Sequence, residues 1–454
     1  MKKGFLILLV FALPFYTMAQ KQDTVATLSG RIDSEKPMLL VVERQVGMPQ
    51  RLAESNITGE YNVTFTVKEP MLLSINIGRQ LFSSDFFVAP GAKINLDLTD
   101  KKFQGSYAEV NNLLQRLFRK EFKPKTTGLK AFTKPYAEAL YRSYQEQEKM
   151  IEISGLSVKD QRIVKGYIQF HLLKNMYMMI QRSKVFGKAF SAPDVAPDYS
   201  DPLFGMDWVS ELTFNGDWFS VFQEWLCAQV QSGKIKINSR ATYLNDMASV
   251  IKDPKLQEVY LLRAIKAELL QGNVKGLEER LQQAERIVKS KEGKDELAAC
   301  RCELKKSIYQ DMVGLDLGGY GFPDVQGDTV YLSDFKGKYV FIDLWSTGCN
   351  PCVAEITYAK RLENRLKDLS LEWVSISLDS HADIWKSFMK QKNMGGVQLL
   401  CSRAYKHPLM QKMSVHGIPR FIILDPAGKV WDPSSRRPSD PVLGELLLKE
   451  LAKN

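Results

Sequence analysis

Hydrophobic and polar residues alternate in short runs through the first hundred residues, after an apolar N-terminal stretch. Four runs rich in β-branched residues lie at 38–43, 61–67, 72–77 and 93–98. Turn-forming residues such as Pro90-Gly91 separate the runs, and this spacing is typical of short strands joined by tight turns. The pattern predicts a small antiparallel β-sandwich over residues 24–104.

From residue 105 onward the apolar positions take the three-to-four-residue spacing of amphipathic helices. Segments with this spacing lie at 107–122, 135–153, 158–182, 218–231, 254–271 and 295–312. No fixed repeat period links them, so region 105–313 is predicted to be a helical bundle or a stack of helical hairpins. Met176, Met178 and Met179 are interpreted as core packing, and His171 beside them as a core or surface histidine rather than a ligand.

Residues 314–454 alternate strand-like and helix-like segments. Strands are predicted at 329–332, 339–345, 372–378, 397–401, 421–425 and 429–431, and helices at 350–369, 382–392, 405–413 and 442–451. The strand at 339–345 is apolar at nearly every position, which is typical of a strand covered on both faces. The alternation predicts an α/β domain with a mixed, helix-covered sheet. With 454 residues in total, the chain is expected to be multidomain.

The candidate chemistry lies directly after that buried strand. Small residues form a turn, Cys349 follows, and Pro351 and Cys352 come next. Proline is tolerated in the first turn of a helix, so Cys349 should lie at a helix N-terminus with Cys352 one turn further in. Unpaired N–H groups and the helix dipole favour a thiolate there, the form that attacks disulfides. We interpret Cys349 as the nucleophile and Cys352 as the resolving thiol of a redox-active disulfide.

Two other interpretations of this cysteine pair are zinc binding and structural packing. A structural zinc site needs a second pair of Cys or His residues at ligand spacing, and no such pair is present, so no metal is expected. Cys300 and Cys302 lie two residues apart in a predicted helix, where their side chains diverge and cannot bridge. Cys227 and Cys401 are expected to be buried packing residues.

The segment WSTGCNPC, with Asp343 before it and Glu355 after it, is similar to the active site of TlpA/ResA-type thiol:disulfide oxidoreductases of the bacterial envelope. The resemblance covers roughly residues 315–454 and implies a C-terminal thioredoxin fold. It also implies that Pro419 is a cis proline facing the cysteines, and that the backbone of Ile418 binds an extended substrate. The β-rich region resembles an uncharacterised β domain that precedes such domains.

Three further residues are candidates for the site. Asp343 lies inside the apolar strand, and burial raises the pKa of an acid, so we expect it to accept the proton of Cys352 during resolution. Glu355 lies one turn after Cys352 and is expected either to tune a thiol or to be a solvated acid. Trp345 is predicted to pack beside the site and shape the substrate surface.

Two residues depart from the pattern of the family. Gly348 stands where relatives usually have an aromatic residue, so the rim of the site is expected to be more open. Arg420 stands where threonine is common, and is expected to place a positive charge beside the docking strand.

The N-terminus predicts export. Lys2 and Lys3 precede an apolar run at 5–13, and small residues lie at the cleavage positions before residue 20, so residues 1–19 are interpreted as a signal peptide. No later segment is apolar enough to span a membrane. The mature protein is therefore expected to be soluble in the periplasm or cell envelope.

Composition adds little to this picture. The net charge is +10, which falls to +8 when Lys2 and Lys3 are removed. No arginine-rich tract accompanies it, so the charge is interpreted as solvated surface and no nucleic-acid partner is expected.

The sequence thus predicts a periplasmic thiol–disulfide oxidoreductase that reduces protein disulfides without a cofactor. Its expected partners are disulfide-bonded envelope proteins and a membrane thiol electron donor. One alternative is an envelope binding or scaffold protein whose redox domain is an accessory switch. The other is a thiol peroxidase, which would form a sulfenic acid at Cys349.

Overall fold

The computed structural model describes most of the chain in two compact units. The described residues are 24–44, 50–78, 85–119, 134–186, 206–215, 217–394 and 396–452. The first unit contains the described residues up to Leu226 together with Ile251–Leu256, and the second contains Cys227–Val250 and the chain from Gln257 onward. The signal peptide predicted at 1–19 lies outside the described residues, and the domain boundaries at 104/105 and 313/314 stay predictions.

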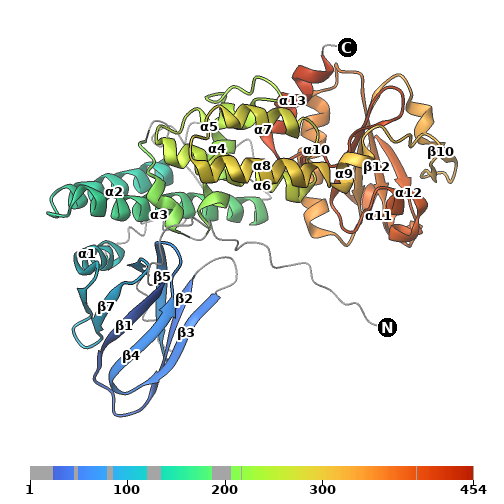
Figure 1. Cartoon of the computed structure of the whole chain (residues 1–454). Helices are drawn as coiled ribbons and strands as arrows, with labels where there is room; N and C mark the ends of the chain where they lie inside the picture. The colour runs from blue at the N-terminus through green and yellow to red at the C-terminus, as the bar shows by residue number, and fades with distance from the viewer. Residues whose placement is uncertain are drawn as a thin grey trace. The chain divides into compact units, whose positions relative to one another are not determined.

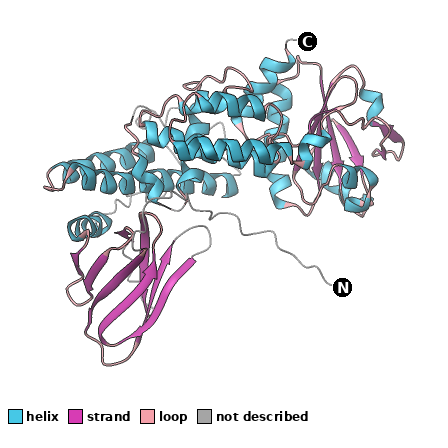
Figure 2. Ribbon diagram, viewed as in Figure 1, coloured by secondary structure: helices cyan, strands magenta, loops and turns pink. Residues whose placement is uncertain are grey.

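The described part of the first unit begins with eight strands in two four-stranded sheets (Figures 1 and 2). The strands are β1 (Val25–Ile32), β2 (Met38–Arg44), β3 (Gln50–Ile57), β4 (Gly59–Thr66), β5 (Met71–Ile77), β6 (Asp85–Val88), β7 (Lys93–Asp97) and β8 (Lys102–Gly105). The sheet orders are β4-β1-β7-β8 and β3-β2-β5-β6.

One strand pair corrects the expectation of a purely antiparallel domain. Strand β1 pairs with β7 in parallel, with Leu28 opposite Ile94, while the other pairs of these two sheets are antiparallel. A parallel neighbour requires a crossover connection, and here the five intervening strands supply it. Buried residues of both sheets, such as Leu28 of β1 and Leu40 of β2, belong to one hydrophobic cluster. The sandwich itself stays a prediction.

Helices follow from residue 108 to residue 312. They are α1 (Ala108–Arg119), α2 (Lys134–Glu152), α3 (Val158–Phe186), α4 (Trp218–Gln231), α5 (Tyr243–Ala248), α6 (Pro254–Gln271), α7 (Leu277–Glu285), α8 (Lys291–Lys305) and α9 (Ile308–Met312), with a 3₁₀ turn η3 (Ser210–Phe214). The helix predicted at 295–312 is divided between α8 and α9, because Ser307 has an extended backbone with φ −72° and ψ 125°.

The residues singled out on α3 lie in different environments. Met176 is buried, as expected, whereas Met178 is exposed, so these two methionines do not share one core face. The side chain of Met179 lies outside the described part of the chain. The Nε2 atom of His171 lies 3.4 Å from the Asp85 carboxylate, which fits the interpretation of a core or surface histidine.

The C-terminal part forms a five-stranded mixed sheet of order β13-β12-β11-β14-β15. Its elements are β9 (Gly321–Pro323), β10 (Thr329–Tyr331), η4 (Leu332–Phe335), β11 (Tyr339–Trp345), α10 (Asn350–Arg365), β12 (Leu371–Ser377), α11 (Ala382–Lys392), β13 (Val397–Leu400), η5 (Ala404–Lys406), α12 (Pro408–Lys412), β14 (Arg420–Leu424), β15 (Val430–Asp432) and α13 (Pro441–Leu451). Strands β11, β12 and β13 are parallel to one another, and β14 is antiparallel to β11. This confirms the predicted mixed α/β sheet.

The central strand β11 is buried along its whole length. Val340 and Ile342 belong to one hydrophobic cluster, while Tyr339 and Phe341 belong to another. Since successive side chains of a strand point to opposite faces, the two clusters cover the two faces of the sheet. The C-terminal end of β11 therefore emerges from the core of the domain and carries the candidate site.

Candidate active site

The two cysteines lie where β11 gives way to α10. Cys349 is the N-cap residue of α10, with an extended backbone (φ −90°, ψ 94°), and Pro351 lies in the first turn. Its Sγ atom is bonded to that of Cys352, with 5.2 Å between the two Cα atoms. Cys349 is half-buried and Cys352 is buried. The helix start, its proline and the cysteine pairing are thus as predicted.

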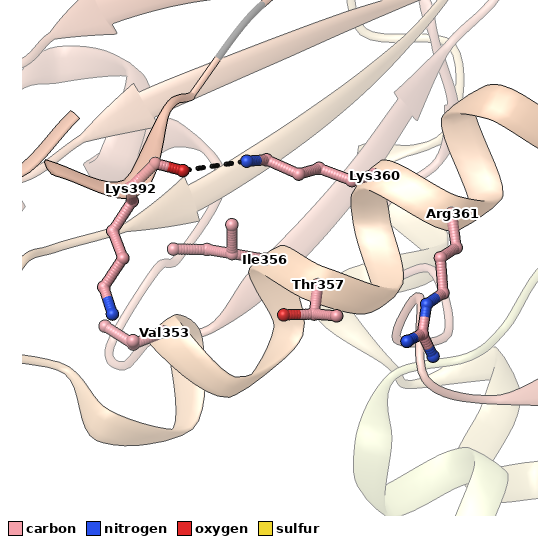
Figure 3. A pocket seen from close by; sticks show the side chains of 6 residues that line it. All are labelled: Val353, Ile356, Thr357, Lys360, Arg361 and Lys392. Carbon is pink, nitrogen blue, oxygen red and sulfur yellow. Dashed lines mark hydrogen bonds between the residues drawn. The ribbon is translucent and has the colours of Figure 1, made fainter. Parts of the chain in front are cut away.

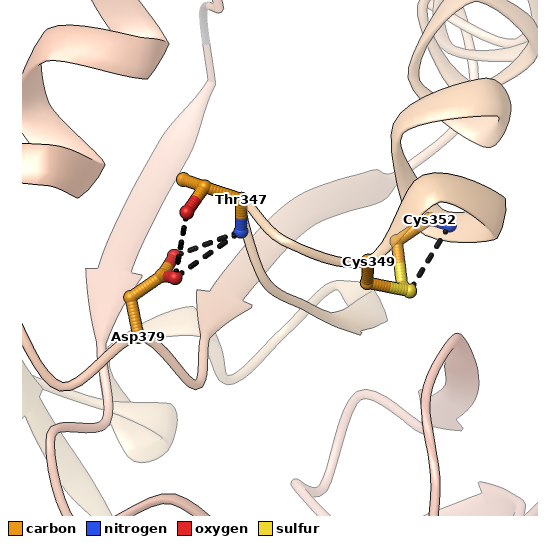
Figure 4. The surroundings of a disulfide bond; sticks show 4 residues. All are labelled: Thr347, Cys349, Cys352 and Asp379. Atoms are coloured by element: carbon orange, nitrogen blue, oxygen red, sulfur yellow. Dashed lines mark hydrogen bonds between the residues drawn. A yellow bond between two sulfur atoms is a disulfide. The ribbon is translucent and has the colours of Figure 1, made fainter.

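The backbone of the helix provides a donor for the first sulfur. The N–H of Cys352 donates a hydrogen bond to Cys349 Sγ over 3.2 Å (Figure 4). This is one of the N–H groups that a helix leaves without an intrahelical acceptor. On reduction, the same donor and the positive end of the helix dipole favour a thiolate at Cys349.

A carboxylate on the neighbouring strand end anchors the turn before the cysteines. Asp379 accepts hydrogen bonds from the N–H of Thr347, at 3.0 Å, and from its hydroxyl, at 2.8 Å (Figure 4). The hydroxyl of Ser377 also donates to this carboxylate, at 2.6 Å. Sequence reasoning missed Asp379, because nothing in the local pattern of β12 indicates that it contacts a turn 32 residues earlier.

The rim of the site is apolar. Cys349, Val353, Phe388, Met394 and Ile418 are partly buried and pack against one cluster. The Ile418–Pro419 peptide bond is cis, as the family resemblance implied. A Cβ atom at Gly348 would have nothing within 4 Å, which agrees with the expected open rim.

Two predicted roles need correction. Trp345 packs in the same cluster as Cys352, but its side chain is completely buried, so it cannot touch a docked substrate directly. Arg420 does not direct its charge at the docking strand. Its guanidinium lies 4.6 Å from the ring centroid of Tyr309 and donates to the carbonyl of Pro433 at 2.6 Å.

Both acids predicted for the site are buried. Asp343, in the middle of β11, has a pKa raised to about 7, chiefly by burial and then by the negative charge of Glu355. Its Oδ1 atom has no hydrogen-bond partner among the described residues. Glu355 is also buried, which excludes the solvated alternative, and its carboxylate accepts two bonds from Ser439. Ser439 was not anticipated from the sequence.

Comparison with known proteins shows which family the C-terminal part of the chain resembles. Residues 337–430 match the family model described as thioredoxin-like. The thiol-disulfide oxidoreductase ResA of Bacillus subtilis (strain 168) is 29% identical over 126 residues, which make up 28% of this chain and 67% of that protein. The C-terminal part of this chain is a TlpA/ResA-type thioredoxin-like domain.

Further relatives match the same part of the chain. ResA of Bacillus anthracis is 26% identical over 118 residues, or 26% of this chain and 66% of that protein. The thioredoxin domain of a thiol-disulfide oxidoreductase from Bacteroides vulgatus is 27% identical, and the match covers 31% of this chain and 97% of that one, with a TM-score of 0.28. The chain spans about half to two thirds of the length of the first Bacillus relatives.

The TlpA/ResA-type domain also has a pocket along α10, after the cysteines in the sequence. It has a volume of about 300 Å³ and is lined by Val353, Ile356, Thr357, Lys360, Arg361 and Lys392 (Figure 3). Positions 353, 356, 357 and 360 follow Cys349 at helical spacing, so they continue its face of α10. The Lys360 ammonium is held by the carbonyls of Lys392 and Asn393.

Neither a metal cluster nor a membrane-spanning helix is found in the part of the chain that the structure describes. Within the described ranges, no group of three or more His, Cys, Asp or Glu side chains could hold a metal ion. None of the described helices has the length and apolar character needed to cross a bilayer.

The remaining cysteines take no part in a disulfide within the described residues. Cys401 is buried, as expected, and so is Cys300, whereas Cys302 is exposed. Cys300 and Cys302 do not bridge, which confirms that their helical spacing keeps them apart. The expectation for Cys227 needs correction, because its side chain is half-buried on α4 rather than fully enclosed.

Proposed function

We propose that the protein is a thiol–disulfide oxidoreductase that reduces protein disulfides in the periplasm or cell envelope. The observation that carries the proposal is the Cys349–Cys352 disulfide at the start of α10, with the first cysteine half-buried and the second buried. One sulfur is open to a substrate and the other is shielded from it, which suits a nucleophile and a resolving thiol.

The reaction consists of two exchanges. The Cys349 thiolate attacks one sulfur of a substrate disulfide, forms a mixed disulfide and displaces the first substrate thiolate. The Cys352 thiolate then attacks Cys349 Sγ, closes the enzyme disulfide and displaces the second substrate thiolate. Two electrons pass from the enzyme dithiol to the substrate, and the displaced thiolates take up protons.

The acids and the rim have separate roles in this proposal. Asp343, with its raised pKa, takes the proton of Cys352 before the second attack, since an acceptor that titrates near the working pH is efficient. Glu355 tunes this acceptor through its charge. Ile418 and Pro419 present the backbone on which an extended substrate pairs as an added strand.

The proposed location rests on the N-terminal segment, and the proposed exchange chemistry rests also on the relatives. Residues 1–19 have the composition of a signal peptide, and the ResA relatives are thiol-disulfide oxidoreductases. Outside the cytoplasm a reductase needs a continuous supply of electrons, so a membrane thiol donor is part of the proposal. No bound cofactor is needed, because the electrons travel in thiols.

The test is disulfide reduction by the mature full-length chain. The wild type should accelerate insulin reduction by dithiothreitol, and Cys349→Ser should leave only the uncatalysed rate. The reduction potential of the pair gives the direction: a value near that of thioredoxin, about −270 mV, supports a reductase, and one near that of DsbA, about −120 mV, an oxidase.

A binding or scaffold protein with an accessory redox switch is the second candidate. It is favoured by the length of chain, 313 residues, that precedes the predicted redox domain. It predicts that wild-type protein shows no catalytic turnover and that oxidation changes its affinity for an envelope partner. A thiol peroxidase is ranked third, and it requires rapid trapping of sulfenic acid at Cys349 by dimedone after peroxide.

A further inference from the structure

The segment that joins β15 to α13 contacts both the helices and the redox site. We call residues 433–440 the β15–α13 connection. Within its own domain it is held by a hydrogen bond from the Ser435 N–H to the carbonyl of Phe421, at 2.9 Å. At its end, Asp440 caps α13 by accepting from the N–H of Val442, also at 2.9 Å.

Helices α5 and α6 hold the first half of the connection. Arg436 donates to the hydroxyl of Tyr243 at 2.7 Å, pairs with Glu268, and stacks over the Tyr243 ring at 4.6 Å. The Ser434 hydroxyl donates to the carbonyl of Gln271, the last residue of α6, at 2.7 Å. Both Arg436 and Glu268 are largely shielded from water, so this ion pair is screened less than a surface pair.

Neighbouring charges extend the same contact. Arg240 pairs with Asp432 at 2.9 Å and with Glu450 at 3.0 Å, and Arg280 lies 3.5 Å from Glu268. The space that these side chains leave is only about 10 Å³, which is at most the room for one water molecule. The cluster is therefore a packed contact between the helices and the thioredoxin-like domain rather than a ligand pocket.

The second half of the connection reaches Glu355. Ser439 donates its N–H to Glu355 Oε2 at 2.9 Å and its hydroxyl to Oε1 at 2.8 Å. One residue thus binds both oxygens of a buried carboxylate. Hydrogen bonds of this kind are strongest when the acceptor is ionised, so Ser439 keeps a negative charge in place on the inner face of α10.

That charge acts on Asp343. Asp343 lies opposite Ser375 of β12 and Phe421 of β14 in the strand register. The negative charge of Glu355 raises the pKa of Asp343 beyond the effect of burial.

The other charged residue nearby in the connection is Arg436, three residues before Ser439. Arg436 pairs with Glu268 and Asp440, so its own charge is already compensated.

We propose that Ser439 is a positioning residue of the redox site, and that helices α5 and α6 keep it in place by holding Arg436. Through Ser439 and Glu355, the helical region then sets the protonation of Asp343. This gives the helices a role in the exchange reaction, and it rests on the proposed function for its biological meaning. Chain connectivity alone would not provide this link, because α6 ends at Gln271, far before Ser439 in the sequence.

The first experiment measures the titration of Asp343 in the oxidised full-length chain. Carboxyl ¹³C NMR, with Asp343→Asn to identify the signal, should show a transition near pH 7 in the wild type. Ser439→Ala removes one of the two donors, weakens the hold on the Glu355 charge, and should shift the transition down by about half a pH unit. Ser439→Thr keeps a hydroxyl and should restore the wild-type value.

Ser435→Ala is the matched control in the same connection. Ser435 is buried, as Ser434 is, but its hydroxyl has no hydrogen-bond partner among the described residues. The Ser435→Ala variant should therefore leave the titration of Asp343 unchanged.

The second experiment tests the link to the helices. Glu268→Gln weakens the anchor of Arg436 and should shift the Asp343 transition in the same direction as Ser439→Ala, but less. Combined with Ser439→Ala it should add nothing, because both changes act through one contact. Glu285→Gln breaks the ion pair with Arg301 elsewhere on the helices and should cause no shift.

The outcomes separate the two proposals. An unchanged Asp343 transition in a folded Ser439→Ala protein, or an equal shift in Ser435→Ala, would overturn the role of Ser439. No shift in Glu268→Gln would overturn the role of the helices. If the shifts appear but the wild type reduces no disulfide, the positioning holds and the proposed oxidoreductase function fails.

Discussion

The two sides of the disulfide differ in almost every physical respect. On the outer side, Cys349 is half-buried, Gly348 leaves open space, and the rim consists of partly buried apolar side chains. On the inner side, Cys352 is buried, and two acids, Asp343 and Glu355, lie in the protein interior. The outer side leaves room for a substrate to reach Cys349, and the inner side holds the acids that can exchange a proton with Cys352.

This difference indicates that the two exchange steps are under separate control. Attack on a substrate needs an accessible thiolate and a docking surface. Resolution needs a second thiolate inside the protein, where ionisation is costly unless a nearby group takes the proton. Changes on one side should therefore alter one step and leave the other.

The largest contrast is between the two cysteines themselves. Cys349→Ser should lower disulfide turnover at least about a thousandfold, since no thiolate remains to attack. Cys352→Ser should still attack but should accumulate a mixed disulfide with the substrate, which mass spectrometry detects. If Cys352→Ser left free enzyme and Cys349→Ser trapped substrate, the assignment of the two sulfurs would be reversed.

The next prediction concerns the buried acid and the dependence of stability on pH. The folded pKa of Asp343 is about 7, above its unfolded value near 3.9, so the folded state binds the proton more tightly. The stabilisation is complete below pH 4 and is lost as the pH rises to 7, by up to about 4 kcal/mol. Urea unfolding of the oxidised protein at several pH values measures this loss.

Asp343→Asn should remove this contribution and should slow resolution more than attack. Between pH 4 and pH 7, the unfolding free energy of the wild type should therefore fall relative to that of Asp343→Asn. Identical slopes in the two proteins would show that Asp343 does not titrate in this range.

A smaller effect is expected when the turn before the cysteines loses its hydrogen bonds to Asp379. Asp379→Ala removes the acceptor for the N–H and the hydroxyl of Thr347. It should cost about 2 kcal/mol of unfolding free energy and should slow attack severalfold, with little change in resolution. Asp383→Ala, in the exposed first turn of α11, is the control and should affect neither quantity. An equal loss in both variants would argue against a specific anchor.

The smallest effect concerns the pocket on α10. Lys392 lines it and is exposed, so Lys392→Gln should raise KM about twofold for a substrate with acidic residues beside its disulfide. Lys390→Gln, on α11 like Lys392 but outside the pocket lining, should leave KM unchanged. Steady-state kinetics at low and high salt decide between them, since the difference should vanish at high salt.

The sequence predicted the parts of the site that depend on local order. The apolar run of β11, the turn after it and Pro351 together fix where α10 begins, and the cysteines follow from that. The helix at 382–392 and the strand at 339–345 also lie where the pattern placed them. Local pattern was sufficient here because a strand buried on both faces is apolar at nearly every position, and a helix start favours proline in its first turn.

Contacts between distant segments were not predictable in this way. Asp379 and Ser439 are short polar residues in connections, and neither has a feature that names its partner. The break between α8 and α9 was missed because Ser307 fits a helical spacing while its backbone is extended. The direction of Arg420 was missed because its partner, Tyr309, belongs to a helix far earlier in the chain.

The charged contact between the helices and the thioredoxin-like domain has a practical consequence for expression of partial chains. A protein truncated to residues 314–454 would retain Asp432, Arg436 and Glu450 but lose Arg240 and Glu268, to which they are paired. If the helices position Ser439 as proposed, activity measured on such a fragment would come from a site in which Ser439 still binds Glu355 but has lost the support of Glu268 through Arg436.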